Sequence, residues 1–174
     1  MTGPSITVEQ LADRLAIEDT LALYCRGIDR CDAEALHAVF PPDAKLDYGY
    51  GPQEPAPMIE GLLDSLSAMR LTQHNIGNVV CRIDGDSAKA ETYCVALHIF
   101  DNDAGDETEL VVGGRYLDTL AKRDGRWLIV ERLYIMDWNR MGLATMQTSG
   151  GMFDALKRTG ARKPDDPSYA WWQE

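Results

Sequence analysis

Residues 79–100 read VVCRIDGDSAKAETYCVALHIF, and this stretch decides the fold class. Apolar and polar side chains alternate on both sides of Asp84-Gly85, which predicts two antiparallel strands joined by a tight hairpin. Asp124-Gly125 repeats the turn signal further along the chain. We therefore expect four antiparallel strands, over residues 75–84, 87–100, 108–122 and 126–138.

The chain before these strands follows a helical period instead. Tyr24, Cys25 and Ile28 recur at the spacing of one helix face, which predicts a helix over residues 7–30 with Thr7 as its N-cap. The further expectations are a short helix after Asp32, a strand over 43–50, a proline-rich loop over 51–57 and a helix over 60–69. Helices followed by a strand meander predict an α+β fold with the helices on one face of an antiparallel sheet.

Composition limits the classes of partner. The chain has 174 residues and a formal net charge of −11, so its surface repels nucleic acids and anionic membranes. No apolar run approaches 18 residues and the N-terminus carries no export signal, so we expect a cytoplasmic protein without a transmembrane helix. The cysteines lie far apart with no CxxC pair, which favours buried thiols over a zinc site.

Asp29 and His74 are the first candidates for chemistry. Asp29 follows the apolar face of the first helix, where burial would raise its pKa as a general base requires. Alternatively, it is a solvated helix-end carboxylate or pairs with Arg26 or Arg30. His74 lies where the third helix gives way to a strand, and it is either an acid–base group or a surface histidine. If a carboxylate held its second nitrogen, the two would form a base dyad.

The remaining candidates lie on strands. His98 shares a strand face with Cys94 and Ala96, and it is either a pocket residue or a satisfied core histidine. On the last strand, four residues of alternate spacing are expected to form a pocket wall: Arg132, Tyr134, Met136 and Trp138. In the alternative interpretation this face is an open ladder of cross-strand pairs with Arg132 in a salt bridge. No dinucleotide, phosphate-loop or metal motif occurs, so we expect proton-transfer chemistry without a cofactor or metal.

Four motifs together resemble the SnoaL-like branch of the nuclear transport factor 2-like superfamily: YCRGID (24–29), QHNIGN (73–78), GGRYLD (113–118) and DGRW (124–127). The resemblance covers about residues 6–140. It implies a cone-shaped, strongly curved antiparallel sheet wrapped by helices around a deep pocket. Residues 141–174 are then a C-terminal extension that forms a pocket lid or an oligomer contact. The adjacent Trp171 and Trp172 are expected to pack on the body or on a neighbouring subunit.

The resemblance also implies roles for individual residues. In the cofactor-independent lyases of this branch, such as hexachlorocyclohexane dehydrochlorinase and the scytalone and bile-acid dehydratases, an Asp–His pair removes a proton while a leaving group departs. Asp29 and His74 match that pair, Arg132 matches the arginine that assists the leaving group, and Tyr24 matches a catalytic tyrosine. Three further positions match residues that line the pocket: Val112, Tyr116 and Met136.

Two departures limit what the resemblance implies. Met136 replaces an arginine of the bile-acid dehydratase, and Ala96 or a neighbour replaces its second aspartate.

We therefore expect a lyase acting on an apolar cyclic or aromatic small molecule, working as a homodimer or homotrimer. The alternatives are an isomerase on a steroid-like ketone and a non-catalytic module such as a dioxygenase β-like subunit, because this fold hosts several functions.

Overall fold

The first helix is confirmed by its capping interactions. The computed structural model describes residues 7–173. Helix α1 (Val8–Arg30) begins with a capping box, in which Thr7 and Gln10 exchange hydrogen bonds between side chain and backbone. It ends where Cys31 adopts a left-handed conformation with φ of 50°. Helix α2 (Ala33–Val39) follows at once, and Asp32 is its N-cap as expected.

Helix α3 (Pro55–Ser67) begins earlier than the sequence pattern indicated. The prolines at 55 and 57 were expected to lie in a loop, and this prediction is wrong. Proline is tolerated in the first turn of a helix because the backbone N–H groups there have no intrahelical acceptor. With this start, α3 has about three and a half turns. It ends at Ser67, shortly before the first long strand of the sheet begins at Leu71.

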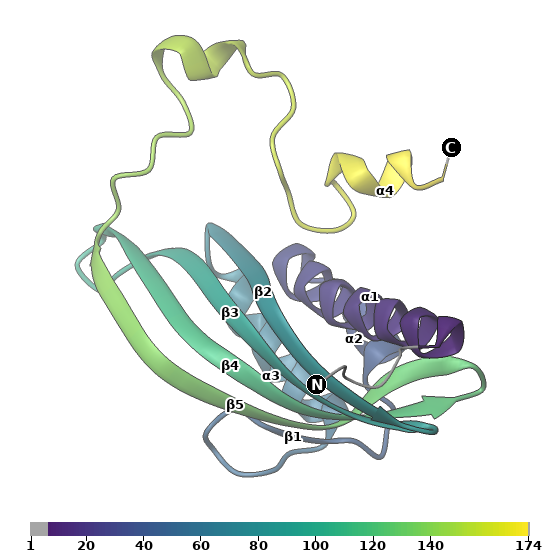
Figure 1. Ribbon diagram of the computed structural model, residues 1–174. Coiled ribbons are helices and arrows are strands. Elements are labelled where there is room, and N and C mark those ends of the chain that lie inside the picture. Colours follow the sequence, from purple (N-terminus) through teal and green to yellow (C-terminus); the bar gives the residue numbers. More distant parts are fainter. Residues whose placement is uncertain (1–6, 174) are drawn as a thin grey trace, which may run out of the picture.

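The sheet has the order β1-β5-β4-β3-β2 and is curved and unclosed (Figure 1). Its long strands form an antiparallel meander, with bounds β2 (Leu71–Asp84), β3 (Ser87–Asp101), β4 (Glu107–Arg123) and β5 (Arg126–Leu143). The α+β class is confirmed. One detail is corrected, because the short β1 (Lys45–Asp47) pairs parallel to β5 and makes the sheet mixed.

The hydrophobic core lies between the helices and the concave face of the sheet. Figure 1 shows α1 crossing this face, with α2 and α3 beside it. Ile17 and Leu21 of α1, Leu36 of α2, and Leu120 and Ile129 of the sheet are at most 1% exposed. The amphipathic period of α1 therefore packs against the inward-facing period of the strands.

A bulge in β5 changes which residues face the core. Gly114 pairs with Met136, whereas its neighbour Gly113 pairs with Trp138, so Asp137 is the extra residue. A bulge shifts the alternation of side chains between the two faces. Met136 therefore stays on the concave face, and Trp138 lies on the convex face against Gly113.

The C-terminal extension passes over the end of α1 (Figure 1). It holds a short 3₁₀ helix, η1 (Gly151–Ala155), and helix α4 (Pro167–Trp171). Trp171 and Trp172 contact each other edge to face and are 63% and 69% exposed, so they do not pack on the body of this chain. Packing on a neighbouring subunit stays a prediction. Among residues 7–173, no helix has both the length and the apolar character needed to cross a membrane.

Candidate active site

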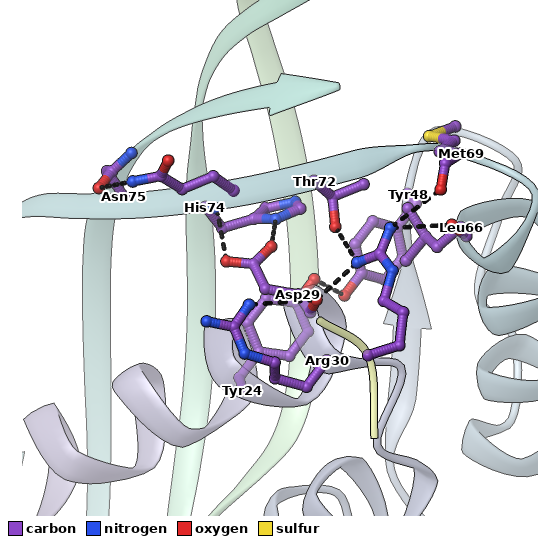
Figure 2. A network of polar contacts seen from close by, with 11 residues as sticks. Tyr24, Asp29, Arg30, Tyr48, Leu66, Met69, Thr72, His74 and Asn75 are labelled. Carbon is purple, nitrogen blue, oxygen red and sulfur yellow. Dashed lines mark hydrogen bonds and ion pairs between the residues drawn. The ribbon is translucent and has the colours of Figure 1, made fainter. Parts of the chain in front are cut away.

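Asp29 and His74 form a hydrogen-bonded pair where α1 ends and β2 begins. One carboxylate oxygen of Asp29 lies 2.7 Å from Nδ1 of His74, and the other accepts the backbone N–H of His74 at 2.8 Å (Figure 2). The two side chains are about one-tenth exposed. Two contacts to one residue fix the ring orientation, and a carboxylate at Nδ1 favours the tautomer with its proton on that atom. Nε2 is then the nitrogen that can accept a proton.

The alternative pairings of Asp29 do not occur. Arg30 forms its salt bridge with Asp166 at 3.1 Å, and Arg26 donates to the hydroxyl of Ser168. Arg30 reaches only the backbone carbonyl of Asp29, at 3.5 Å. The Asp29 carboxylate is therefore left to His74.

His74 lines a cavity of about 290 Å³ between the helices and the concave face of the sheet. Most of the cavity wall is apolar or aromatic, with a few polar tips, which is the usual character of a small-molecule pocket. The structure brings seven of the predicted site residues to this cavity: Tyr24, His74, His98, Val112, Tyr116, Tyr134 and Met136. The remaining wall residues are Ile28, Tyr48, Leu62, Leu66, Cys94 and Ala96.

Two tyrosine hydroxyls form a second polar group in the cavity. The hydroxyl oxygens of Tyr24 and Tyr48 are 2.8 Å apart. Burial, and after it the neighbouring Tyr48, raises the pKa of Tyr24 well above its usual value, and burial also raises the pKa of Tyr48. Both hydroxyls therefore stay protonated at neutral pH, so they can donate hydrogen bonds to a substrate oxygen or to a departing group.

His98 contributes a neutral imidazole to the same cavity. Its ring packs edge to face on His74 at 5.4 Å between centroids, and its buried Nδ1 has no hydrogen-bond partner among the described residues. Burial, and after it the proximity of His74, lowers the pKa of His98 to about 4. An unpartnered buried nitrogen carries a free-energy cost, so His98 is a pocket residue and not a satisfied core histidine.

Comparison with known proteins places this fold and site in a family. Residues 9–133 match the SnoaL-like domain. The chain belongs to the SnoaL-like family. A Mycobacterium tuberculosis protein of strain ATCC 25618 / H37Rv, itself uncharacterised, is 30% identical over 140 residues, which cover 78% of this chain and 93% of that protein.

Solved structures confirm the fold of this SnoaL-like chain. The hexachlorocyclohexane dehydrochlorinase LinA-type3 from Novosphingobium barchaimii LL02 aligns with a TM-score of 0.69 and 18% identity, covering 83% of this chain and 99% of the other. A candidate scytalone dehydratase from Novosphingobium aromaticivorans DSM 12444 gives a TM-score of 0.67 and 22% identity, with coverages of 75% and 87%. The nuclear transport factor 2-like fold is thereby confirmed.

Arg132 of this SnoaL-like chain does not reach the cavity, in contrast to the role the resemblance implied. It is 2% exposed and binds the Asp118 carboxylate through two hydrogen bonds of 2.7 and 2.8 Å. Its guanidinium carbon lies 3.9 Å from the ring centre of Tyr24 and 4.1 Å from that of Tyr116. Burial opposes the charge, but Asp118, together with the neighbouring Tyr48 and Tyr24, raises the pKa of Arg132 well above its usual value. The salt bridge of the alternative interpretation is therefore observed, but the face is not an open ladder, because Tyr134 and Met136 of the same strand line the cavity. Arg132 lies against the rings of Tyr24 and Tyr116, outside the cavity.

Two further outcomes concern residues at the edge of the prediction. Trp138 does not line the cavity that His74 lines, because the bulge in β5 places it on the convex face, where it is half exposed. Tyr48 was missed: it lies in the strand expected over 43–50, but the observed β1 ends at Asp47, so the strand pattern did not show which way this side chain points.

The histidine, cysteine and carboxylate side chains also bear on metal binding and on thiol chemistry. No group of three or more His, Cys, Asp or Glu side chains suited to a metal ion occurs among residues 7–173. All four cysteines are free; Cys25 and Cys94 are buried as expected, whereas Cys31 and Cys81 are only partly buried. Burial raises the pKa of Cys25 to about 12, which leaves it protonated and unreactive.

Proposed function

We propose that this protein is a cofactor-independent lyase that eliminates a leaving group from a small cyclic or aromatic molecule. The observation that carries the proposal is the Asp29–His74 pair at the wall of an apolar cavity, with the Tyr24–Tyr48 hydroxyls in the same cavity. The names of the two structural relatives, a dehydrochlorinase and a candidate dehydratase, support the same class of reaction.

The proposed reaction uses His74 as the general base. Nε2 takes a proton from a substrate carbon, and the electrons of that C–H bond form a carbon–carbon double bond. The bond to the neighbouring leaving group breaks, and the group departs with its electron pair. A departing hydroxyl takes a proton from the tyrosine pair and leaves as water. Asp29 stabilises the imidazolium, and solvent afterwards removes the proton from Nε2 and, where a hydroxyl has left as water, returns a proton to the tyrosine pair.

The shape of the cavity narrows the substrate class. Its volume of about 290 Å³ is at the lower end of ligand pockets, which hold roughly 300–1,000 Å³. This size favours one or two rings over a steroid. The wall offers ring faces from Tyr116 and Tyr134, 5.6 Å apart between centroids, against which a flat apolar substrate can pack.

Turnover of a compound panel tests the proposal. Hydroxylated and halogenated one- and two-ring compounds are incubated with the protein, and mass spectrometry follows the loss of water or hydrogen halide. We expect His74→Gln to lower turnover by about 10²–10⁴-fold, the usual contribution of a general base. His37→Gln, which alters an exposed histidine of α2, is the matched control and should keep full turnover.

Other outcomes identify the alternatives. Equal turnover in His74→Gln would rule out the general base assigned here. A product of unchanged mass would indicate an isomerase, in which the proton returns to another carbon. Tight binding of a panel compound without any product would indicate a binding module.

A further inference from the structure

The C-terminal extension binds the end of α1 through several polar contacts. Lys163 donates its backbone N–H to the carbonyl of Arg30 at 2.8 Å, and its ammonium group lies 2.9 Å from the Asp32 carboxylate. The Tyr169 hydroxyl also donates to Asp32, at 2.7 Å, and Asp166 pairs with Arg30. The extension is therefore anchored beside Asp29 and does not merely pass over it.

Arg162 of this anchored segment contacts three elements that build the site. One terminal nitrogen donates to the backbone carbonyl of Asp29 and, at 2.7 Å, to the hydroxyl of Thr72. The other donates to the carbonyls of Leu66 at 3.1 Å and Met69 at 3.4 Å. Figure 2 shows these four acceptors gathered between the end of α1, the end of α3 and the start of β2.

These acceptors suit an arginine for two physical reasons. The last carbonyls of a helix have no intrahelical donor and carry partial negative charge, so a cation there is favourable. Asp29 and Leu66 lie in the last turns of α1 and α3. A guanidinium also presents several donors in one rigid plane, whereas the single ammonium of lysine cannot serve acceptors on three separate elements at fixed positions.

The position of these contacts relative to the pair is what matters. Arg162 binds the main chain of Asp29, whose carboxylate holds His74, and it binds Thr72, two residues before His74 on the same strand. Thr72 is 3% exposed and Arg162 is half-buried, so the contact is partly shielded from solvent. Arg162 also lines an outer cavity of about 740 Å³ that includes Asp29 and His74.

We propose that Arg162 is a positioning residue, by which the C-terminal extension holds Asp29 and His74 in register. It joins the helix that carries the carboxylate to the strand that carries the imidazole. Its loss lets α1 and β2 shift against each other, which lengthens the contact between Asp29 and Nδ1 of His74. The kinetic consequence rests on the proposed function: a displacement of about 1 Å can cost about 10²-fold in rate, and it should lower kcat more than it changes KM.

The test reads the pair directly by NMR of protein labelled with ¹⁵N-histidine. In the wild type we expect a strongly low-field proton on Nδ1 of His74, because that proton is bonded to a buried carboxylate. Arg162→Ala should weaken or remove this resonance and increase the fraction of the tautomer with its proton on Nε2. Arg162→Lys should restore it only in part. Added guanidinium ion at millimolar concentration should restore it in Arg162→Ala, by refilling the space of the lost side chain.

Arg158→Ala is the matched control, because Arg158 is an exposed arginine of the same segment. It should leave the resonance unchanged. A folded Arg162→Ala protein with the wild-type resonance would overturn the proposal, as would equal recovery by lysine. If Arg162→Ala does not fold, the same resonance is followed in Arg162→Lys, with and without added guanidinium ion. A resonance equal to that of the wild type in Arg162→Lys would overturn the proposal.

The two proposals fail in different ways. Absence of the low-field proton in the wild type would contradict both, because each depends on the bonded pair. A resonance that depends on Arg162 in a protein that turns over no panel compound would support the positioning role and contradict the lyase.

Discussion

At the scale of single residues, two imidazoles meet in one cavity under different electrostatic conditions. Asp29 binds Nδ1 of His74, so a positive charge formed on that ring is compensated. No carboxylate binds His98 among the described residues, and burial lowers its pKa to about 4. Under the proposed lyase function, these surroundings suit His74 to the role of base, while His98 stays neutral.

The lowered pKa of His98 predicts a pH-dependent stability. An unfolded histidine titrates near pH 6.5, so between about pH 6.5 and pH 4 the unfolded chain binds a proton at His98 that the folded chain does not. The free energy of unfolding therefore falls as the pH is lowered through this window, and His98 contributes no slope above or below it. We expect His98→Gln to remove a slope equivalent to about one proton.

Urea unfolding at pH 7 and at pH 4.5 measures this effect. The wild type should lose more stability on acidification than His98→Gln does. His37→Gln removes an exposed histidine and should follow the wild type. Parallel losses in the wild type and His98→Gln would contradict the neutral, buried state assigned to His98.

The sequence located the residues that lie in ordered patterns. Asp29 could be predicted because it closes the apolar face of α1. His74 was found as a residue between a helix and a strand expected from 75, although β2 begins at Leu71 and His74 lies within it. Tyr48 could not be predicted, because the strand expected over 43–50 ends at Asp47, and no sequence pattern indicated the parallel pairing of β1 with β5 that brings Tyr48 to Tyr24. The salt bridge of Arg132 was one of two interpretations, but its partner could not be named, because Asp118 lies opposite Arg132 on the neighbouring strand only through a register shift between Thr119 and Leu120.

At the scale of elements, the bulge between β4 and β5 shapes one wall of the cavity. Gly114 lies at this irregularity, opposite Met136. A Cβ atom at Gly114 would lie 2.4 Å from the backbone oxygen of Ile135 and 2.8 Å from the Tyr134 ring. The backbone cannot move aside cheaply at such distances, so a side chain at this position forces a local rearrangement.

Gly114→Ala is therefore expected to lower the free energy of unfolding by about 1–3 kcal/mol, the usual cost of overpacking. Gly77→Ala is the control, since a Cβ at this other strand glycine meets nothing within 4 Å. Chemical denaturation of the two variants beside the wild type checks the difference. Similar midpoints for both alanine variants would show that the close approach at Gly114 has no energetic weight.

The same bulge explains why the prediction for β5 was right in part. Strict alternation places Arg132, Tyr134, Met136 and Trp138 on one face. The first three of these four side chains do face inward, and Trp138 does not. No sequence pattern marks Asp137 as the extra residue of the bulge. Its ion pair is with Arg115 of the neighbouring strand and not with a residue close to it in sequence. Patterns of period two predict strands well, but they do not contain the irregularities that decide which face a residue takes.

At the scale of the whole molecule, a buried charge cluster joins the fold to the site. Arg132 and Asp118 lie below the cavity, and the side chains of both are fully buried. Arg132 also lies against the ring of Tyr24, which ends in the cavity. The ion pair therefore joins β4 to β5 and also contacts Tyr24 of α1, which lines the cavity. Its effect on folding and its effect on turnover can be measured separately.

Asp118→Leu leaves the guanidinium buried without its counter-charge, so we expect it to lower the free energy of unfolding by about 3–5 kcal/mol. That is a large part of the 5–15 kcal/mol of a typical domain. Arg132→Met should cost a similar amount by leaving the carboxylate alone. The double variant Asp118→Leu, Arg132→Met should regain much of the loss, because well-packed apolar residues often replace a buried ion pair without penalty.

A double-mutant cycle of unfolding free energies measures the coupling, and the turnover of the double variant separates the two roles of the pair. We expect the double variant to regain stability but to turn over substrate more slowly. Without the Arg132 cation against its ring, Tyr24 is held less firmly in the position from which it hydrogen-bonds to Tyr48. Additive losses would contradict the coupling. A double variant that is both stable and fully active would mean that the pair serves the fold alone, and that the tyrosines need no support from behind.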